Sequence, residues 1–172
     1  MTTQIQSGPL PQIIRAGEGQ SIDTRDTLLL FKLASREPMS GCSLALSVTQ
    51  PGGGPPPHLH HRDAELFLVV EGELQVGSVQ GWQTVRAGDV VFLPARGVHT
   101  FRNTGTRPSK HWVLLTAPDF EAFYAKFAAI LNAAHDGPPD VQRLQAAAAE
   151  YGIEFVSPDA VPGIAPEAVA LP

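Results

Sequence analysis

The feature that most constrains this chain is a series of short apolar runs between residues 28 and 116, each followed by turn residues. The runs are rich in Val, Leu and Phe, which is typical of strands, and Gly-containing turns such as those at 71–73 and 87–89 separate them. Gly and Pro, 16 of each, add to this turn-rich character. We therefore predict a mainly β fold, either a sandwich or a barrel. Its expected strands cover residues 28–33, 42–49, 65–71, 73–78, 90–93, 100–103 and 111–116.

The apolar pattern changes after Pro118 from strand-like to helical. A helix is predicted over 119–133, and its phenylalanines are expected to pack in the core or at an interface rather than around a substrate. A second, alanine-rich helix is expected over about 139–151. Short strands are also predicted at 12–14 and 153–156.

The charge pattern argues against nucleic acid as a partner. The net charge is −5, and the 12 Lys and Arg residues are scattered, so no basic block could neutralise a run of phosphates.

The single cysteine, Cys42, allows neither an internal disulfide nor a cysteine-based zinc site. Residues 1–15 show no signal-peptide pattern and no apolar run reaches membrane-spanning length. We therefore expect a cytoplasmic protein with no membrane partner.

Three of the six histidines stand together just before the strand expected at 65–71. His58 and His60 are two residues apart, so on an extended segment both imidazoles project from the same face. Glu65 lies an odd number of residues after His60 and would point the other way on a continuous strand. We therefore expect a turn at 61–64 that returns Glu65 to the face of the two histidines.

A fourth candidate ligand, His99, stands at the start of the strand expected at 100–103, and barrel closure can bring it beside the other three. Three imidazoles and one carboxylate suit a single divalent transition metal, with Fe, Mn or Ni favoured and Zn, Co or Cu as alternatives. A metal that prefers six ligands would keep about two positions for water, oxygen or substrate. His61, which points away, is expected at the rim, and His111 is expected to be structural or solvated.

These residues lie in two segments that resemble the two conserved motifs of the cupin superfamily. The first motif is carried by Gly52, His58, His60, Glu65 and Gly72, and the second by Gly88, Pro94, His99 and Asn103. The second segment departs from the family pattern at Arg96, where the family usually has Gly.

The resemblance covers roughly residues 28–156 and is closest to small bacterial cupins grouped with quercetin dioxygenase-like proteins. It implies a cupin double-stranded β-helix, a jelly-roll barrel, with a short C-terminal helical extension. The expected parts are an N-terminal arm or edge strand (1–27), the barrel (28–117), the helical extension packing on the barrel (118–156) and a tail (157–172).

The resemblance also implies a metal-dependent, dioxygenase-type oxidoreductase acting on a small organic or aromatic substrate. Glu65 is then the expected catalytic residue, because it is the ligand best able to take up a proton. Phe67, Arg96 and Phe101 are expected to contact the substrate, with Arg96 anchoring a carboxylate at the barrel mouth. Asn103 is expected to orient a ligand from behind. The alternatives are a non-catalytic small-molecule binding or sensing protein, or a metal-dependent isomerase or decarboxylase.

Cupins of this size usually pair through an edge strand or a swapped terminus. The residues before Leu28 could serve that purpose, and we therefore expect a homodimer.

Overall fold

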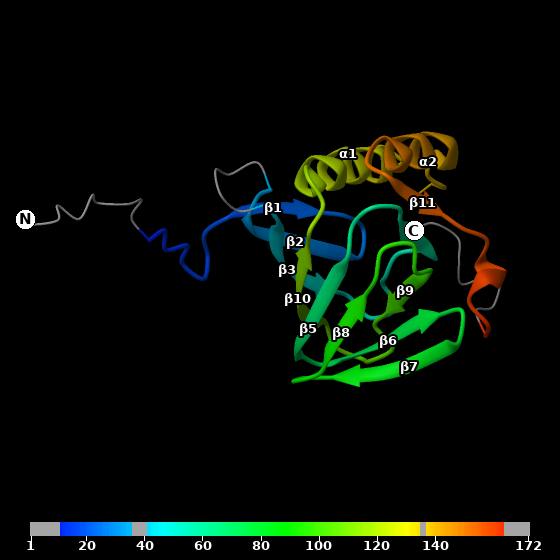
Figure 1. Cartoon of the computed structure of the whole chain (residues 1–172), viewed down its shortest axis with the longest axis horizontal. Coiled ribbons are helices and arrows are strands. Elements are labelled where there is room, and N and C mark those ends of the chain that lie inside the picture. The colour runs from blue at the N-terminus through cyan, green and yellow to red at the C-terminus, as the bar shows by residue number, and fades with distance from the viewer. Residues whose placement is uncertain (1–10, 36–40, 135–136, 164–172) are drawn as a thin grey trace, which may run out of the picture.

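The computed structural model describes residues 11–35, 41–134 and 137–163, and its ribbon is a β-barrel with two helices lying over one end (Figure 1). In chain order the elements are β1 (Gln20–Asp23), β2 (Thr27–Leu33), β3 (Ser43–Thr49), β4 (His58–His60), β5 (Glu65–Glu71), β6 (Glu73–Ser78), β7 (Gly81–Arg86), β8 (Val90–Leu93), β9 (His99–Arg102), β10 (Ser109–Leu115), α1 (Phe120–Ala133), α2 (Val141–Glu150), β11 (Ile153–Phe155) and a 3₁₀ turn (Pro158–Ala160).

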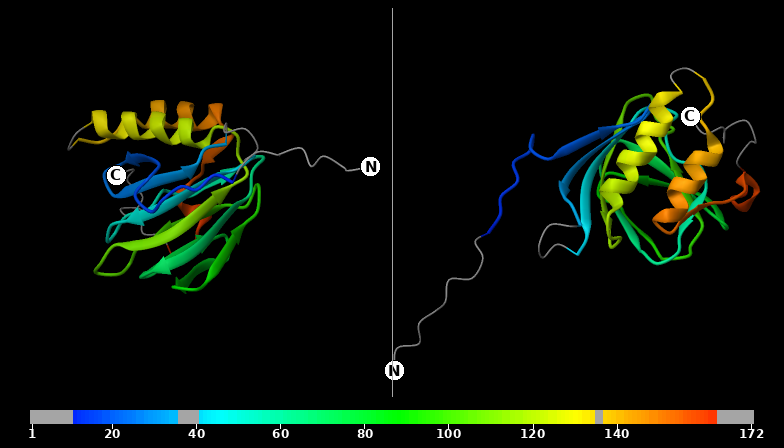
Figure 2. Two further views of the ribbon diagram at one scale, coloured as in Figure 1. Left: turned by 90° about the vertical axis from the view of Figure 1, so that its left-hand side faces the viewer. Right: turned by 90° about the horizontal axis from the view of Figure 1, so that it is seen from above.

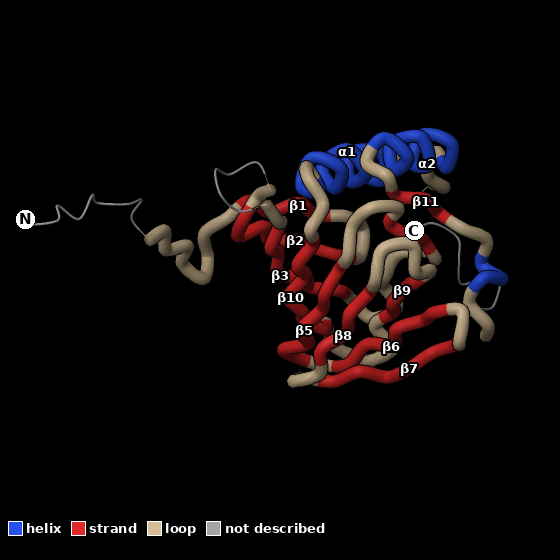
Figure 3. Tube along the Cα trace, in the orientation of Figure 1, coloured by secondary structure: helices blue, strands red, loops and turns tan. Residues whose placement is uncertain are grey.

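The strands form two antiparallel sheets that enclose the core (Figure 3). One sheet has the order β1-β2-β3-β10-β5-β8, and the other has the order β11-β4-β9-β6-β7. Along β3 and β10 every second residue is buried, which is the pattern of strands with one face on a core. Side chains such as Phe67, Val113 and Leu115 thereby fill the barrel. The predicted mainly β architecture is confirmed.

The two helices lie side by side across one end of the barrel (Figure 2). The buried face of α1 carries Phe120, Phe123 and Phe127, so the periodicity seen in the sequence is the face that covers the barrel. Helix α2 begins after Asp140, whose side chain accepts a hydrogen bond of 3.0 Å from the Arg143 N–H. Neither of these helices is long and apolar enough to cross a membrane, within the part of the chain that the structure describes.

A buried carboxylate fixes α1 to the six-stranded sheet. Glu121, in the first turn of α1, is buried, and the hydroxyl of Ser43 on β3 donates to its Oε2 at 2.9 Å. The hydroxyl of Ser35 lies 3.2 Å from Oε1 of the same carboxylate. These bonds satisfy a charge that would otherwise be costly to bury, and they define where the helix sits on the barrel.

Both predicted helices and the strands from 28 to 116 are confirmed to within two residues, but the sequence misplaced one strand and missed another. The strand predicted at 12–14 is wrong, because Ile13 is 67% exposed and the edge strand is β1, paired with β2 from Gln20 to Asp23. Strand β7 was missed since its residues are mostly polar and exposed, although it pairs with β6 along its whole length.

The expected N-terminal arm (1–27) and tail (157–172) lie partly outside the described residues. Within the described part of the arm, β1 is the edge strand of the six-stranded sheet. The homodimer and the cytoplasmic location stay predictions.

Candidate functional site

Four candidate metal ligands meet inside the barrel. His58 and His60 come from β4, Glu65 is the first residue of β5, and His99 is the first residue of β9. All four are buried, and one donor atom of each lies within 4.8 Å of the donor atoms of the others. Nε2 of His99 is 3.2 Å from Oε2 of Glu65, and Nε2 of His60 is 3.8 Å from it. One cation could contact all four at this spacing.

Strand pairing and one turn create this cluster. His58 lies directly opposite His99 in the antiparallel pair of β4 and β9, and their ring centroids are 4.3 Å apart. The turn at 61–64 then restarts the strand alternation, so that Glu65 points into the barrel, as the sequence predicted. The Ala64 N–H donates to Oγ1 of Thr116 at 3.2 Å and anchors that turn to the end of β10.

Backbone carbonyls orient two of the imidazoles. Nδ1 of His58 donates to the Pro56 carbonyl at 2.9 Å, and Nδ1 of His99 donates to the Gly97 carbonyl at 2.9 Å. In each ring this leaves Nε2 facing the cluster, which is the arrangement of a histidine prepared to bind a metal. The site residues therefore fit a metal in chemistry and orientation. Nδ1 of His60 is buried without a hydrogen-bond partner among the described residues.

Burial and mutual charge shift the pKa of each cluster residue. Burial lowers the pKa of His58 well below its ordinary value and also lowers that of His60, with the positive charge of His99 acting in the same direction on both. Burial raises the pKa of Glu65, but the hydrogen bond from His99 and the nearby imidazoles outweigh it and lower the value. Burial acts to lower the pKa of His99, but the hydrogen bond and charge of Glu65 raise it. In the metal-free cluster these shifts favour charged Glu65 and His99 and neutral His58 and His60.

A cavity of about 110 Å³ lies between this cluster and α1. His58, His60 and Glu65 line its floor together with Ser47 and His111. Its roof is aromatic and consists of Phe120, Phe123, Tyr124 and Phe127 from α1 and Phe155 from β11. Among the described residues that line the cavity there is no Lys or Arg, and the acidic ones are Asp26 and Glu65.

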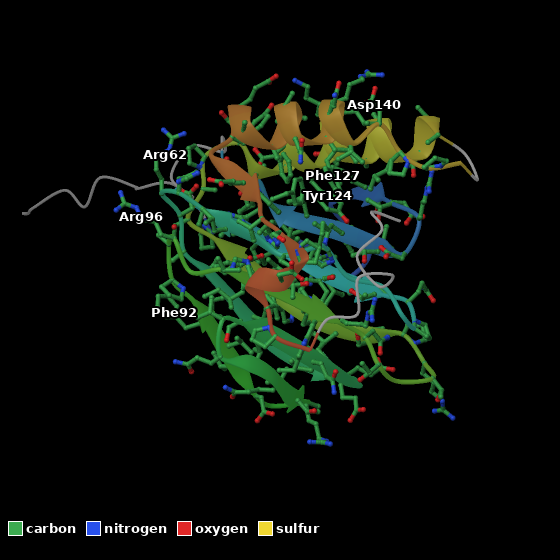
Figure 4. All side chains as sticks on the ribbon, turned by 90° about the vertical axis from the view of Figure 1, so that its right-hand side faces the viewer. Arg62, Phe92, Arg96, Tyr124, Phe127 and Asp140 are labelled. Carbon is green, nitrogen blue, oxygen red and sulfur yellow. The ribbon has the colours of Figure 1, made fainter. Side chains whose placement is uncertain are left out.

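Figure 4 shows Tyr124 and Phe127 on the side of α1 that faces the barrel. The sequence placed the α1 phenylalanines in the core or at an interface; they are buried, and they also form the cavity roof. Helical periodicity revealed that they share a face but could not reveal that this face covers the barrel mouth, because that depends on tertiary packing.

Of the three residues expected to contact substrate, only Phe101 lines the cavity. Phe67 is buried behind it, with its ring edge-on to Phe101 at 5.4 Å between centroids.

Arg96 is exposed, and Figure 4 shows its side chain directed away from the barrel. Its backbone has φ 66°, and its N–H donates to the His60 carbonyl at 2.7 Å. The turn is left-handed at a position where Gly is usual, and Arg96 is not among the residues that line the cavity, so the expected carboxylate anchor stays a prediction.

The expected orienting role of Asn103 is wrong. Its side-chain amide donates to the carbonyls of Thr49 and Arg107, each at 2.8 Å, and its oxygen accepts from the Gly105 N–H at 2.9 Å. These bonds use the amide to hold two loops together at a fully buried position. The side chain therefore stabilises the loops rather than a ligand.

His111 was expected to be structural or solvated. It lies within β10, has no exposed surface and lines the cavity, so the solvated alternative is wrong. His61 behaves as expected: it is at the rim, and its Nε2 is 2.9 Å from Oε2 of Glu154.

Comparison with known proteins agrees with this geometry. Residues 45–115 match the family model of the Cupin domain. The chain has a cupin fold. A predicted oxalate decarboxylase from Thermotoga maritima has a similar cupin structure, with a TM-score of 0.56 and 18% identity over 60% of this chain and 97% of that one. A sugar phosphate isomerase of the cupin superfamily from Silicibacter pomeroyi gives 0.54 and 21%, over 60% and 74%.

Among curated proteins, this cupin chain is similar to Germin-like protein 1-1 of Oryza sativa subsp. japonica. The two are 39% identical over 74 residues, which is 40% of this chain and 34% of the relative. The chain thus spans about a third of the length of that relative.

Proposed function

We propose that His58, His60, Glu65 and His99 hold one divalent transition metal, and that this cupin is a dioxygenase-type oxidoreductase acting on a small, uncharged aromatic compound. The observation that carries the proposal is the cavity, which joins three of the four candidate ligands to an aromatic roof and has no cationic side chain among its described lining residues. Such a cavity favours a flat apolar molecule with oxygen atoms at one end.

Each residue of the site has a role in the proposed dioxygenase reaction. The imidazoles of His58 and His99 present Nε2 to the centre because backbone carbonyls hold their Nδ1 atoms. Glu65 is a buried carboxylate that lines the cavity, so it is the side chain placed to accept a proton from a substrate hydroxyl. The phenyl rings of α1 stack on the substrate and keep water from the floor. A bound redox-active metal supplies electron transfer to O₂ and polarises a substrate oxygen.

The charge of the cavity disfavours the alternative reactions. Oxalate and sugar phosphates, the compounds in the names of the two structural relatives, are anions. Here an anion would find Asp26 at the half-buried margin of the cavity and no Lys or Arg among its described lining residues. An uncharged substrate would not experience this unfavourable electrostatic interaction.

The test begins with the metal content of protein reconstituted separately with Fe²⁺, Mn²⁺ and Ni²⁺. We expect about one ion per chain in the wild type, and far less in a His60→Ala, Glu65→Ala double variant. His61→Ala is the matched control, because it removes a neighbouring imidazole that lies at the rim. Absence of specific metal in the wild type would refute the metal centre.

Oxygen uptake is then measured with the loaded protein and a panel of neutral phenols and anionic acids. We expect uptake with neutral aromatic compounds, with both atoms of ¹⁸O₂ found in the product by mass spectrometry. A stoichiometric metal without oxygen uptake for any compound would refute the oxidoreductase and favour a binding protein with a metal-anchored ligand.

A further inference from the structure

His111 is a buried polar group without a partner inside the cavity. The residue has no exposed surface, and neither Nδ1 nor Nε2 has a hydrogen-bond partner among the described residues. Its ring packs beside two phenyl rings, with centroid distances of 4.7 Å to Phe67 and 5.1 Å to Phe101. The residue opposite it on β3, Ser47, has its hydroxyl 3.3 Å from that of Thr49.

Such an arrangement is costly unless something else binds the ring. A neutral imidazole has one N–H donor and one acceptor nitrogen, and burying either unpaired opposes folding. Burial lowers the pKa of His111 to about 4, so the ring carries no charge near neutral pH. The neighbouring phenyl rings offer neither a lone pair nor a polar hydrogen. The side of the His111 ring that the phenyl rings leave uncovered faces the cavity, which His111 lines.

We propose that His111 is a substrate-binding residue, which hydrogen-bonds a hydroxyl or carbonyl group of a small, uncharged aromatic ligand whose other end reaches the four-residue cluster. The inference rests on the proposed function, because it names the ligand class of the same cavity. It adds a second anchoring point, distinct from the candidate metal ligands, that orients the ligand by its far polar group.

Size and charge define the ligand class further. A cavity of about 110 Å³ has room for on the order of eight water-sized atoms, which is the size of a benzenediol. The aromatic roof matches the faces of such a ring. A neutral imidazole binds a hydroxyl or carbonyl without attracting a carboxylate, and the carboxylate of Asp26 also lines the cavity.

The experiment uses phenol and the three benzenediols as probes, titrated by calorimetry into the full chain without oxygen. Zn²⁺-loaded and metal-free protein are both used, because Zn²⁺ is redox-inert and permits no turnover. In the wild type we expect at least one benzenediol to bind about five- to tenfold more tightly than phenol, the effect of one added hydrogen bond. That gain should disappear in His111→Leu and be partly kept in His111→Gln, with zinc content unchanged in both.

Nitrogen-15 NMR of the wild-type imidazoles provides a readout that does not depend on a variant. The His111 ring nitrogens should show a neutral ring and should shift when the benzenediol binds. An unchanged His111 signal with bound benzenediol, an equal gain in His111→Leu, or no binding of any neutral phenol while benzoate binds would each overturn the proposal. Loss of zinc binding alone would refute the metal centre, and the metal-free titrations would still decide the role of His111.

Discussion

Replacing His111 by Leu should remove a large part of the acid sensitivity of this protein. Burial lowers the pKa of His111 from its ordinary value of 6.5 to about 4 in the folded chain. The unfolded chain takes up a proton on this residue as the pH falls through about 6.5, whereas the folded chain does so only near 4, so acid favours unfolding. The wild type should therefore lose about 2.5 kcal/mol of unfolding free energy between pH 7 and pH 4.5 through this residue alone.

Urea denaturation of metal-stripped protein at several pH values measures this effect. The histidines and the carboxylate of the metal cluster also titrate in both proteins, so their contributions cancel in the difference between wild type and variant except for the electrostatic coupling of Glu65 to His111. At pH 7 the variant should be about as stable as the wild type or slightly more so, because it removes unpaired buried nitrogens. Identical pH dependence in wild type and variant would show that the ring is hydrated and would refute the reasoning.

Three other substitutions test the remaining residues. Asn103→Ala should lower the free energy of unfolding by about 3 kcal/mol in urea titrations, since three hydrogen bonds are lost; a loss below about 1 kcal/mol would contradict this. Asp140→Ala should lower it by about 1 kcal/mol through the lost α2 cap, and an unchanged midpoint would argue against the cap. Arg96→Ala should leave benzenediol affinity, measured by calorimetry, within about twofold of the wild type, because the side chain points outward; a larger loss would place it at the ligand.

The cluster could be predicted from the sequence because its geometry is mostly local. The two-residue spacing of His58 and His60 fixes their shared face on any extended segment, and the short turn before Glu65 follows from the same alternation. The placement of His99 relied on the resemblance to cupin motifs, and its pairing opposite His58 agrees with that expectation.

The rest of the site depends on contacts that sequence patterns do not encode. His111 is buried because β10 has partners on both sides, β3 and β5, and both pairings join residues far apart in the chain. Strand alternation puts His111 on the same face as Val113 and Leu115, but Trp112 and Leu114 make the other face apolar as well, so the sequence did not show which face is buried. Arg96 was singled out because it stands where the resembling family usually has Gly, but the sequence could not show that its side chain points away from the barrel.

The cavity is built by two parts of the fold, the strands of the barrel and helix α1. The floor is set by strand pairing within the barrel, whereas the roof is set by where α1 rests, which Glu121 fixes through Ser35 and Ser43. The two hydrogen bonds that hold α1 do not involve a candidate metal ligand, whereas Phe155 lies on β11, which pairs with the strand that carries His58 and His60. Changes in the α1 part of the roof can thus alter which ring fits above the cluster while the four donor atoms keep their spacing, so selectivity for the ligand and affinity for the metal can vary separately through α1.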